Sequence, residues 1–312
     1  NKMNKDLNIV SKEIRDIITQ KQKEMNLTFV EDTHTYYIKN KDGDIVTNYP
    51  SVSTVIGQFY EPFPDQEKSF DKAKGNLIKQ DEILREWRES GSYSTNMGSR
   101  VHYILEKNLL EQYSSYKEVR MPIFECDEEQ TKSGDNMIEA GMGFIDLMHE
   151  RGAVLLDTEM VLGSVDLGYT GQPDKVWLMF NKKGEIGIVI TDWKTNKPKN
   201  FEVQWYTKKM LKPFGEYHDT SLGHYNVQLP LYGRLLMDML KGTKYEDIRF
   251  FGCVVVHLGV NGELTEYKVP KKIIDTVFTM DPLPRIEHVK EYKVLQEYKE
   301  NERLRKLELI KK

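Results

Sequence analysis

Two apolar runs joined by a polar turn constrain the fold of this chain more than any other feature. Residues 175–180 alternate inward and outward side chains, residues 186–190 are mainly β-branched, and Lys182-Lys183-Gly184 lies between them. This pattern predicts two antiparallel strands connected by a hairpin turn. Pro173 precedes the first run, and a proline belongs at a strand start because it donates no ladder hydrogen bond.

Three functional side chains lie at the ends of these strands. Asp192 and Lys194 are two residues apart, so strand alternation places them on one face. Asp174 begins the first strand, and antiparallel pairing would bring it close to Asp192. Two close carboxylates are costly to desolvate, and a cation with oxygen ligands, Mg²⁺ or Mn²⁺, would hold both ionised. The set suits metal-assisted phosphodiester hydrolysis, whereas an isolated Asp-x-Lys is more often a surface ion pair.

The order of these residues resembles the PD-(D/E)XK nuclease superfamily. Gly-x-Pro-Asp opens the first strand and Asp-Trp-Lys closes the second, with Asp174, Asp192 and Lys194 on the three signature positions. The resemblance implies a mixed α/β fold with a restriction-endonuclease-like core, in which a central mixed β-sheet is flanked by helices. It also implies a Mg²⁺- or Mn²⁺-dependent phosphodiesterase in which these three residues are catalytic and both aspartates bind the metal.

A helix expected at residues 97–113 carries His102 and Glu106 on one face. Such a histidine is, by itself, more often a polar helix residue than a ligand. Gly98-Ser-Arg-Val-His102 resembles the helix that precedes the core in RecB-like members of the superfamily, which implies that His102 binds the metal and that Glu106 supports it. The same resemblance implies a supporting role for Glu159, on a strand expected at residues 154–162.

A second helix, expected at residues 226–240 with Pro230 in its first turn, carries Gln228 and Tyr232 on one face. Packing alone would explain this pair. Gln-x-x-x-Tyr after the Asp-x-Lys strand is, however, the auxiliary motif of the RecB-like nucleases, which implies contacts with nucleic acid. Nearby lysines are candidates for phosphate contacts, although ordinary solvated lysines would look the same: Lys197, Lys208 and Lys209.

Composition excludes several classes of protein. The net charge of −4 argues against a protein that coats nucleic acid by bulk charge, although an enzyme needs only a local basic groove. The two cysteines, Cys126 and Cys253, cannot supply the four ligands of an iron–sulfur cluster, so none is expected. No apolar run is long enough to span a bilayer and the first residues are too polar for a secretory signal, so no membrane association and a cytoplasmic location are expected.

The remaining pattern predicts helical additions around one core. We expect an N-terminal addition at residues 1–92, a nuclease core at residues 93–260, and a C-terminal strand and helices at residues 261–312. The N-terminal addition is expected to contain a helix at 6–22 capped by Asp6, a hairpin at 29–46, and a charged helix at 65–90 that stops at Gly91. A strand and loop are expected at residues 116–132. The charged helix at residues 285–312 is a candidate for binding a protein partner.

The function predicted from these motifs is a metal-dependent nuclease. Within residues 102–232 four motifs follow the order of the resembled family, which favours a DNA exonuclease of recombination, repair or DNA processing, with single strands or duplex ends as its partner. Two alternatives remain open. One is an endonuclease or junction-cutting enzyme on the same fold, and the other is a non-catalytic nucleic-acid-binding or assembly protein that keeps the fold.

Overall fold

A five-stranded mixed sheet forms the centre of the protein in the computed structural model, which describes residues 2–113, 117 and 122–312. Strands β8 and β9 are parallel, whereas the other neighbouring pairs are antiparallel. The predicted mixed α/β class is therefore correct. In spatial order the strands are β10 (Leu264–Lys268), β9 (Arg249–Leu258), β8 (Ile186–Lys194), β7 (Lys175–Phe180) and β4 (Val154–Thr158).

The hairpin predicted from the two apolar runs is confirmed as β7 and β8. The Asn181 side-chain oxygen accepts hydrogen bonds from the backbone N–H groups of Lys183 and Glu185, both at 2.9 Å, which closes the turn locally. Gly184 follows with a φ of +76°, a conformation that glycine adopts without steric cost. The register pairs Lys175 with Thr191 and fixes which residues meet at the far end of the hairpin.

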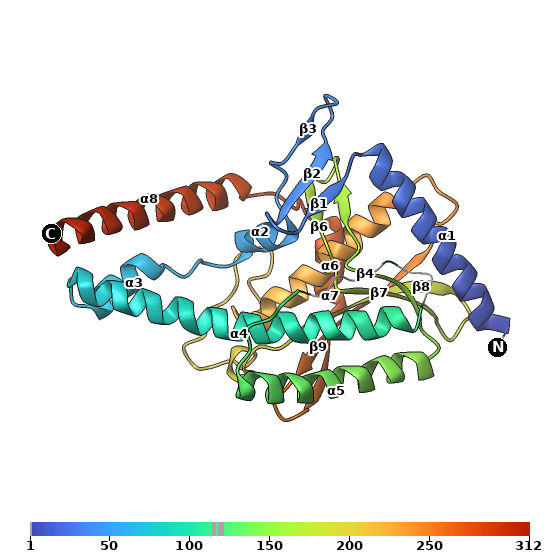
Figure 1. The fold of residues 1–312 in the computed structure, drawn as a ribbon. Coiled ribbons are helices and arrows are strands. Elements are labelled where there is room, and N and C mark those ends of the chain that lie inside the picture. The colour runs from blue at the N-terminus through green and yellow to red at the C-terminus, as the bar shows by residue number, and fades with distance from the viewer. Residues whose placement is uncertain (1, 114–116, 118–121) are drawn as a thin grey trace.

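Helices cover both faces of the sheet (Figure 1). Buried Trp177 and Trp193 point to the face covered by α4 (Leu77–Glu111) and α5 (Glu128–Glu150). Buried Val176 and Ile190 point to the opposite face, which packs against α1 (Lys2–Glu24), α6 (Ser221–Met239) and α7 (Lys271–Thr279). The alternation that marked these strands in the sequence thus serves two apolar cores, one on each side of the sheet.

The predicted N-terminal helix and hairpin are present with altered limits. Asp6 lies inside α1 and does not cap it. The hairpin segment folds as three antiparallel strands, because a second turn precedes the predicted one. The N-terminal and connecting elements are β1 (Thr28–Val30), β2 (Thr35–Lys39), β3 (Ile45–Val46), α2 (Val52–Ile56), the 3₁₀ helices η1 (Gly57–Phe59) and η2 (Pro198–Asn200), and the β-ribbon β5 (Leu162–Ser164) and β6 (Tyr169–Gly171).

The helix break expected at Gly91 was wrong. α4 runs through Gly91 without interruption, and the Thr95 hydroxyl donates to the Gly91 carbonyl oxygen at 2.9 Å. The chain breaks earlier, at Gly75 with a φ of +77°, which separates α4 from α3 (Asp65–Lys72). A mid-helix glycine costs only about 1 kcal/mol, which burial of both halves of α4 outweighs.

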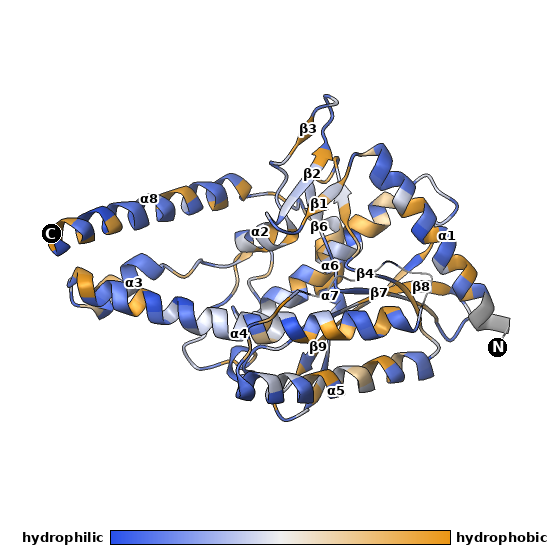
Figure 2. Ribbon diagram, in the orientation of Figure 1, coloured by the Kyte–Doolittle hydropathy of each residue, from blue (hydrophilic) through white to orange (hydrophobic). Residues whose placement is uncertain are grey.

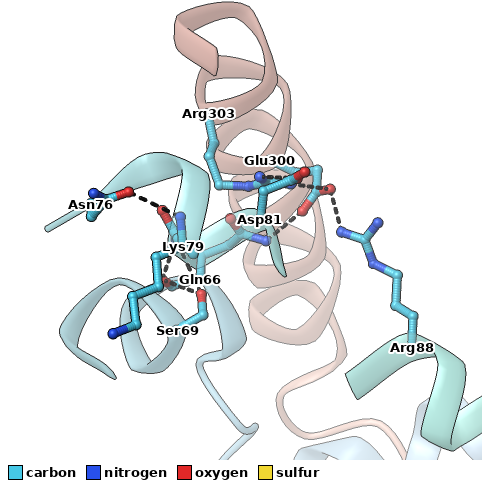
Figure 3. Close-up of polar contacts among 9 residues, drawn as sticks. Gln66, Ser69, Asn76, Lys79, Asp81, Arg88, Glu300 and Arg303 are labelled. Atoms are coloured by element: carbon cyan, nitrogen blue, oxygen red, sulfur yellow. Dashed lines mark hydrogen bonds and ion pairs between the residues drawn. The ribbon is translucent and has the colours of Figure 1, made fainter. Parts of the chain in front are cut away.

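Helix α8 (Ile286–Lys311) lies beside α3 and the first half of α4, and together they form an arm on one side of the molecule (Figure 1). Arg303 is the centre of this contact, with a side chain only 4% exposed that donates to Asp81 at 2.7 Å and to Glu300 at 3.0 Å. Arg88 donates to the same Glu300 at 2.7 Å (Figure 3). Buried polar contacts, more than apolar packing, therefore hold this end of the arm together.

Along α8, hydrophobic residues alternate with stretches of hydrophilic ones (Figure 2). Val294 is 65% exposed and Tyr298 is 63% exposed, whereas Ile286 and Leu307 are buried. The helix thus has one face against its own chain and one face open. The candidate role in binding a protein partner stays a prediction.

Two further expectations need correction. Residues 116 and 118–121 of the strand and loop predicted at residues 116–132 lie outside the described residues. Residues 122–127 form neither helix nor strand, and residues 128–132 begin helix α5, where Asp127 and Gln130 form a reciprocal capping box. Pro230 lies in the middle of α6 and not in its first turn, since α6 begins at Ser221. Its neighbours on both sides are completely buried, so packing outweighs the hydrogen bond that a proline removes.

Candidate active site

The register of β7 and β8 brings Asp174 next to Asp192. Because Lys175 is paired with Thr191, the preceding Asp174 lies opposite the following Asp192. The backbone N–H of Trp193 donates to Asp174 Oδ2 at 2.9 Å, which fixes the orientation of that carboxylate. A side-chain hydrogen bond also joins the two aspartates. The two residues that sequence alternation selected therefore meet at the end of the hairpin.

Lys194 lies on the same face, one alternation beyond Asp192. Its Nζ is 2.9 Å from Asp192 Oδ2, and the side chain is only 16% exposed. The same Nζ sits 4.2 Å from the centre of the Tyr225 ring on α6, a cation–π contact. The ammonium is thus held at the rim of the aspartate pair.

Two glycines allow helices to approach this strand end. A Cβ on Gly98 would lie 2.8 Å from Thr195 Oγ1, so α4 can pass the end of β8 only with glycine at that position. One helical turn later, His102 Nδ1 lies 3.3 Å from Asp174 Oδ2. A Cβ on Gly171 would lie 2.8 Å from Tyr232 Cε1, and its absence lets α6 approach from the other side. The glycines flanking the motifs therefore have a packing role in the site.

Glu106, the supporting residue predicted on α4, also reaches this region. Thr158 Oγ1 donates to its carboxylate at 3.0 Å, and burial raises the pKa of Glu106. Glu159 follows β4 with a φ of +47°, and its backbone N–H donates to the Asp174 carbonyl oxygen at 3.0 Å. Burial, and then the charges of Asp174 and Glu106, hold the pKa of Glu159 well above its usual range.

Lys175 belongs to this cluster and was missed in the sequence. Its side chain is 5% exposed, with Nζ 3.9 Å from Asp174 Oδ2 and 4.1 Å from the centre of the Trp193 ring. Burial lowers the pKa of Lys175, against the opposing effect of the carboxylates around it. A lysine at an inward-facing position of an otherwise apolar strand was the signal that could have identified it.

The carboxylates of this site outnumber its lysines. Burial, and then the negative charge of Asp174, raise the pKa of Asp192 to about 7. Burial also acts to raise the pKa of Asp174, but His102 and Lys175 outweigh it and hold that pKa well below its usual range. Burial acts to lower the pKa of Lys194, and the two aspartates outweigh it and raise that pKa. These opposite shifts favour the ionised form of Asp174 and the protonated form of Asp192.

Gln228 and Tyr232 lie on α6 against the same cluster. The Gln228 side-chain amide donates to the Tyr232 hydroxyl at 3.0 Å. Burial, and then the charges of Asp192 and Asp174, hold the pKa of Tyr232 well above its usual range. Gln228 Oε1 is buried and accepts no hydrogen bond from the part of the chain that the structure describes. An acceptor beside the aspartate pair therefore remains for another donor.

The three lysines predicted to contact nucleic acid lie on the segment between β8 and α6. Lys197 is exposed, Lys208 pairs with Glu61 at 2.6 Å, and Lys209 donates to the Glu216 carbonyl oxygen at 3.0 Å. In the same segment Trp205 is 94% exposed and Tyr206 is 67% exposed. These two rings are not core aromatics. They form a T-shaped pair, with ring centres 5.5 Å apart, on the surface.

The donor chemistry of the site fits a divalent cation. Within residues 2–113, 117 and 122–312, no three His, Cys, Asp or Glu side chains are gathered at metal-binding spacing, because the groups pair with one another. Burial, and then the charge of Asp174, nonetheless raise the pKa of Asp192, and a hard cation would offset both effects by stabilising the ionised carboxylate. Asp174 and Asp192 offer oxygen ligands and His102 a nitrogen ligand, a set suited to Mg²⁺ or Mn²⁺.

Comparison with known proteins adds little. Neither a protein-family model nor a curated protein matches this chain. The crystal structure of a "Putative exonuclease" from Eubacterium rectale is similar with a TM-score of 0.38 and 16% sequence identity, over 78% of this chain and 85% of that chain. At that TM-score the likeness assigns neither a fold family nor an activity. None of the helices in the described part of the chain could cross a bilayer.

Proposed function

We propose that this protein is a metal-dependent nuclease that hydrolyses DNA phosphodiester bonds, as an exonuclease of the RecB-like branch of the PD-(D/E)XK superfamily. The observation that carries the proposal is the convergence of Asp174, Asp192 and Lys194 at one hairpin end, with His102 and Gln228 reaching the same place from two helices. The five-stranded mixed sheet with helices on both faces is in keeping with that family's architecture.

Each residue has a role that follows from its position. Asp174 and Asp192 hold Mg²⁺ or Mn²⁺ with His102 beside them. When bound, such an ion makes a nearby water more acidic and neutralises charge on the scissile phosphate. Lys194 orients the attacking water and stabilises the negative charge that develops on the phosphate, because its ammonium lies at the rim of the pair. Glu106 and Glu159 support the cluster through hydrogen bonds, because Glu106 accepts from Thr158 and the Glu159 backbone N–H donates to the Asp174 carbonyl oxygen.

Helix α6 and the segment before it position the substrate. The free Gln228 Oε1 accepts a hydrogen bond from a base or sugar, and Tyr232 fixes the amide that carries it. Trp205 and Tyr206 provide exposed rings on which bases of a single strand stack. Lys197 lies in the same segment and contacts backbone phosphates. Stacking on aromatic rings does not depend on the base sequence. These groups therefore best fit an enzyme that processes DNA of any sequence, beginning at its ends.

The test compares linear with covalently closed DNA. Purified protein with Mn²⁺ is expected to degrade end-labelled linear DNA progressively and to leave closed circles intact, while Asp192→Asn is inactive on both. Rapid nicking of closed circles would show that the protein is an endonuclease and not an exonuclease. Absence of hydrolysis on every DNA, with Mg²⁺ or with Mn²⁺, would reject the nuclease and leave a non-catalytic binding protein.

A further inference from the structure

His224 extends the row of substrate-facing residues on α6. It lies four residues before Gln228 and eight before Tyr232, so the three share one face of the helix. At 1.5 Å per residue, four residues correspond to about 6 Å along the axis. The next residue, Tyr225, makes the cation–π contact with Lys194 Nζ. His224 therefore stands one helical turn outside the reacting centre, on the side where the helix begins.

The imidazole of His224 is held from two directions. Its Nε2 lies 2.6 Å from Asp219 Oδ1, and the two side chains are 22% and 18% exposed. The Tyr60 ring stacks on it with centres 3.8 Å apart and an angle of 14° between the planes. A ring clamped in this way cannot turn to find other partners, which is how binding groups are pre-organised.

The groups that hold His224 are themselves fixed by long-range contacts. The Asp219 backbone N–H donates to the Lys208 carbonyl oxygen at 2.8 Å, and the Lys208 ammonium pairs with Glu61, the neighbour of Tyr60. The loop at residues 60–61, the segment at 208–219 and the first turn of α6 thus form one unit.

We propose that His224 binds the DNA phosphate next to the one that is cleaved, with Asp219 and Tyr60 as its positioning residues. The inference rests on the nuclease function proposed above. A doubly protonated imidazole ring that donates Nε2–H to a carboxylate still has Nδ1–H as a donor toward an anion. The N-terminus of α6, capped by Thr220 Oγ1 at 3.0 Å from the Gly223 N–H, adds the positive end of a 19-residue helix.

Two substrates separate this role from a structural one. A single-stranded oligonucleotide of about 20 residues has neighbouring phosphates, whereas the p-nitrophenyl ester of thymidine 5′-phosphate has only the phosphate that is cleaved. For His224→Gln we expect KM for the oligonucleotide to rise at least about tenfold, the loss of one charge-assisted hydrogen bond. Its kcat, and all constants for the ester, are expected to stay within about twofold. Asp219→Asn should raise KM for the oligonucleotide by less than His224→Gln does.

The matched control is His218→Gln, a half-buried histidine of the same segment whose constants on both substrates are expected to match the wild type. Equal losses of His224→Gln on both substrates, or no loss on either, would overturn the subsite. Fluorescence anisotropy of the labelled oligonucleotide, in EDTA, measures its affinity for the protein and so tests the phosphate contact without any hydrolysis. If the wild type cleaves neither substrate, the nuclease proposal fails, while an affinity loss of about tenfold in His224→Gln would still support the phosphate contact. Equal affinities would reject it.

Discussion

Replacing Asp192 by asparagine is expected to stabilise the protein while it abolishes activity. The Asp192 carboxyl is 3% exposed and lies beside ionised Asp174, so ionising it in the folded state is unfavourable. An asparagine keeps the shape and can still donate to Asp174 as the protonated acid does. It removes an acidic proton whose loss the fold opposes. Asp192 would thus be a residue that catalysis requires but that lowers the free energy of unfolding.

The magnitude follows from the pKa of Asp192, which rises from 3.8 to about 7 on folding. Because the folded state holds the proton more tightly, wild-type stability falls as pH rises from about 4 to about 7 and is level above that. At 1.36 kcal/mol per pKa unit the full loss is about 4 kcal/mol. Between pH 5 and pH 8 the advantage of Asp192→Asn over the wild type is therefore expected to grow by about 2–3 kcal/mol.

Urea unfolding of both proteins at pH 5 and pH 8, in EDTA, measures this growth directly. The comparison across pH cancels any constant difference between the two side chains. The control is Asp166→Asn, which changes an aspartate that is 86% exposed and should give no such growth. Added Mn²⁺ is expected to stabilise only the wild type, since the variant lacks a ligand. An Asp192→Asn protein whose advantage stays constant or shrinks toward pH 8 would refute the charge argument.

Three further predictions address the ligands and the arm. Lys194→Gln should lower the rate by about 10²–10³ and leave Mn²⁺ affinity intact, since the ammonium acts on the reacting phosphate; calorimetry and single-turnover rates check both parts. His102→Gln should weaken Mn²⁺ binding by at least about tenfold, and an unchanged affinity would make His102 structural. Arg303→Met should cost about 2–4 kcal/mol and expose α8 to proteases, because two carboxylates lose their buried partner. Arg88→Met, at a residue 59% exposed, should cost less than about 1 kcal/mol.

Local periodicity in the sequence determined which residues share a face. Alternation alone placed Asp192 and Lys194 together, and helical spacing paired Gln228 with Tyr232. The turn at residues 182–184 was also readable from its polar residues and Gly184, and the structure shows that Asn181 closes it through a hydrogen bond with Glu185, only four residues away. In each case the information lies in neighbouring residues, so no knowledge of the rest of the fold was needed.

Only the tertiary structure decided what surrounds those faces. Gly91 did not end α4, since contacts of its two halves with distant helices outweighed a weak local preference. Lys175 became a buried member of the site because α4 covers its side of the sheet. His224 gained the stacked ring of Tyr60 from a loop far away in the sequence, whereas its other partner, Asp219, lies only five residues before it. The sequence pattern gives only the face on which a side chain lies. The burial and the neighbouring charges that set its chemistry come from contacts between distant segments of the chain.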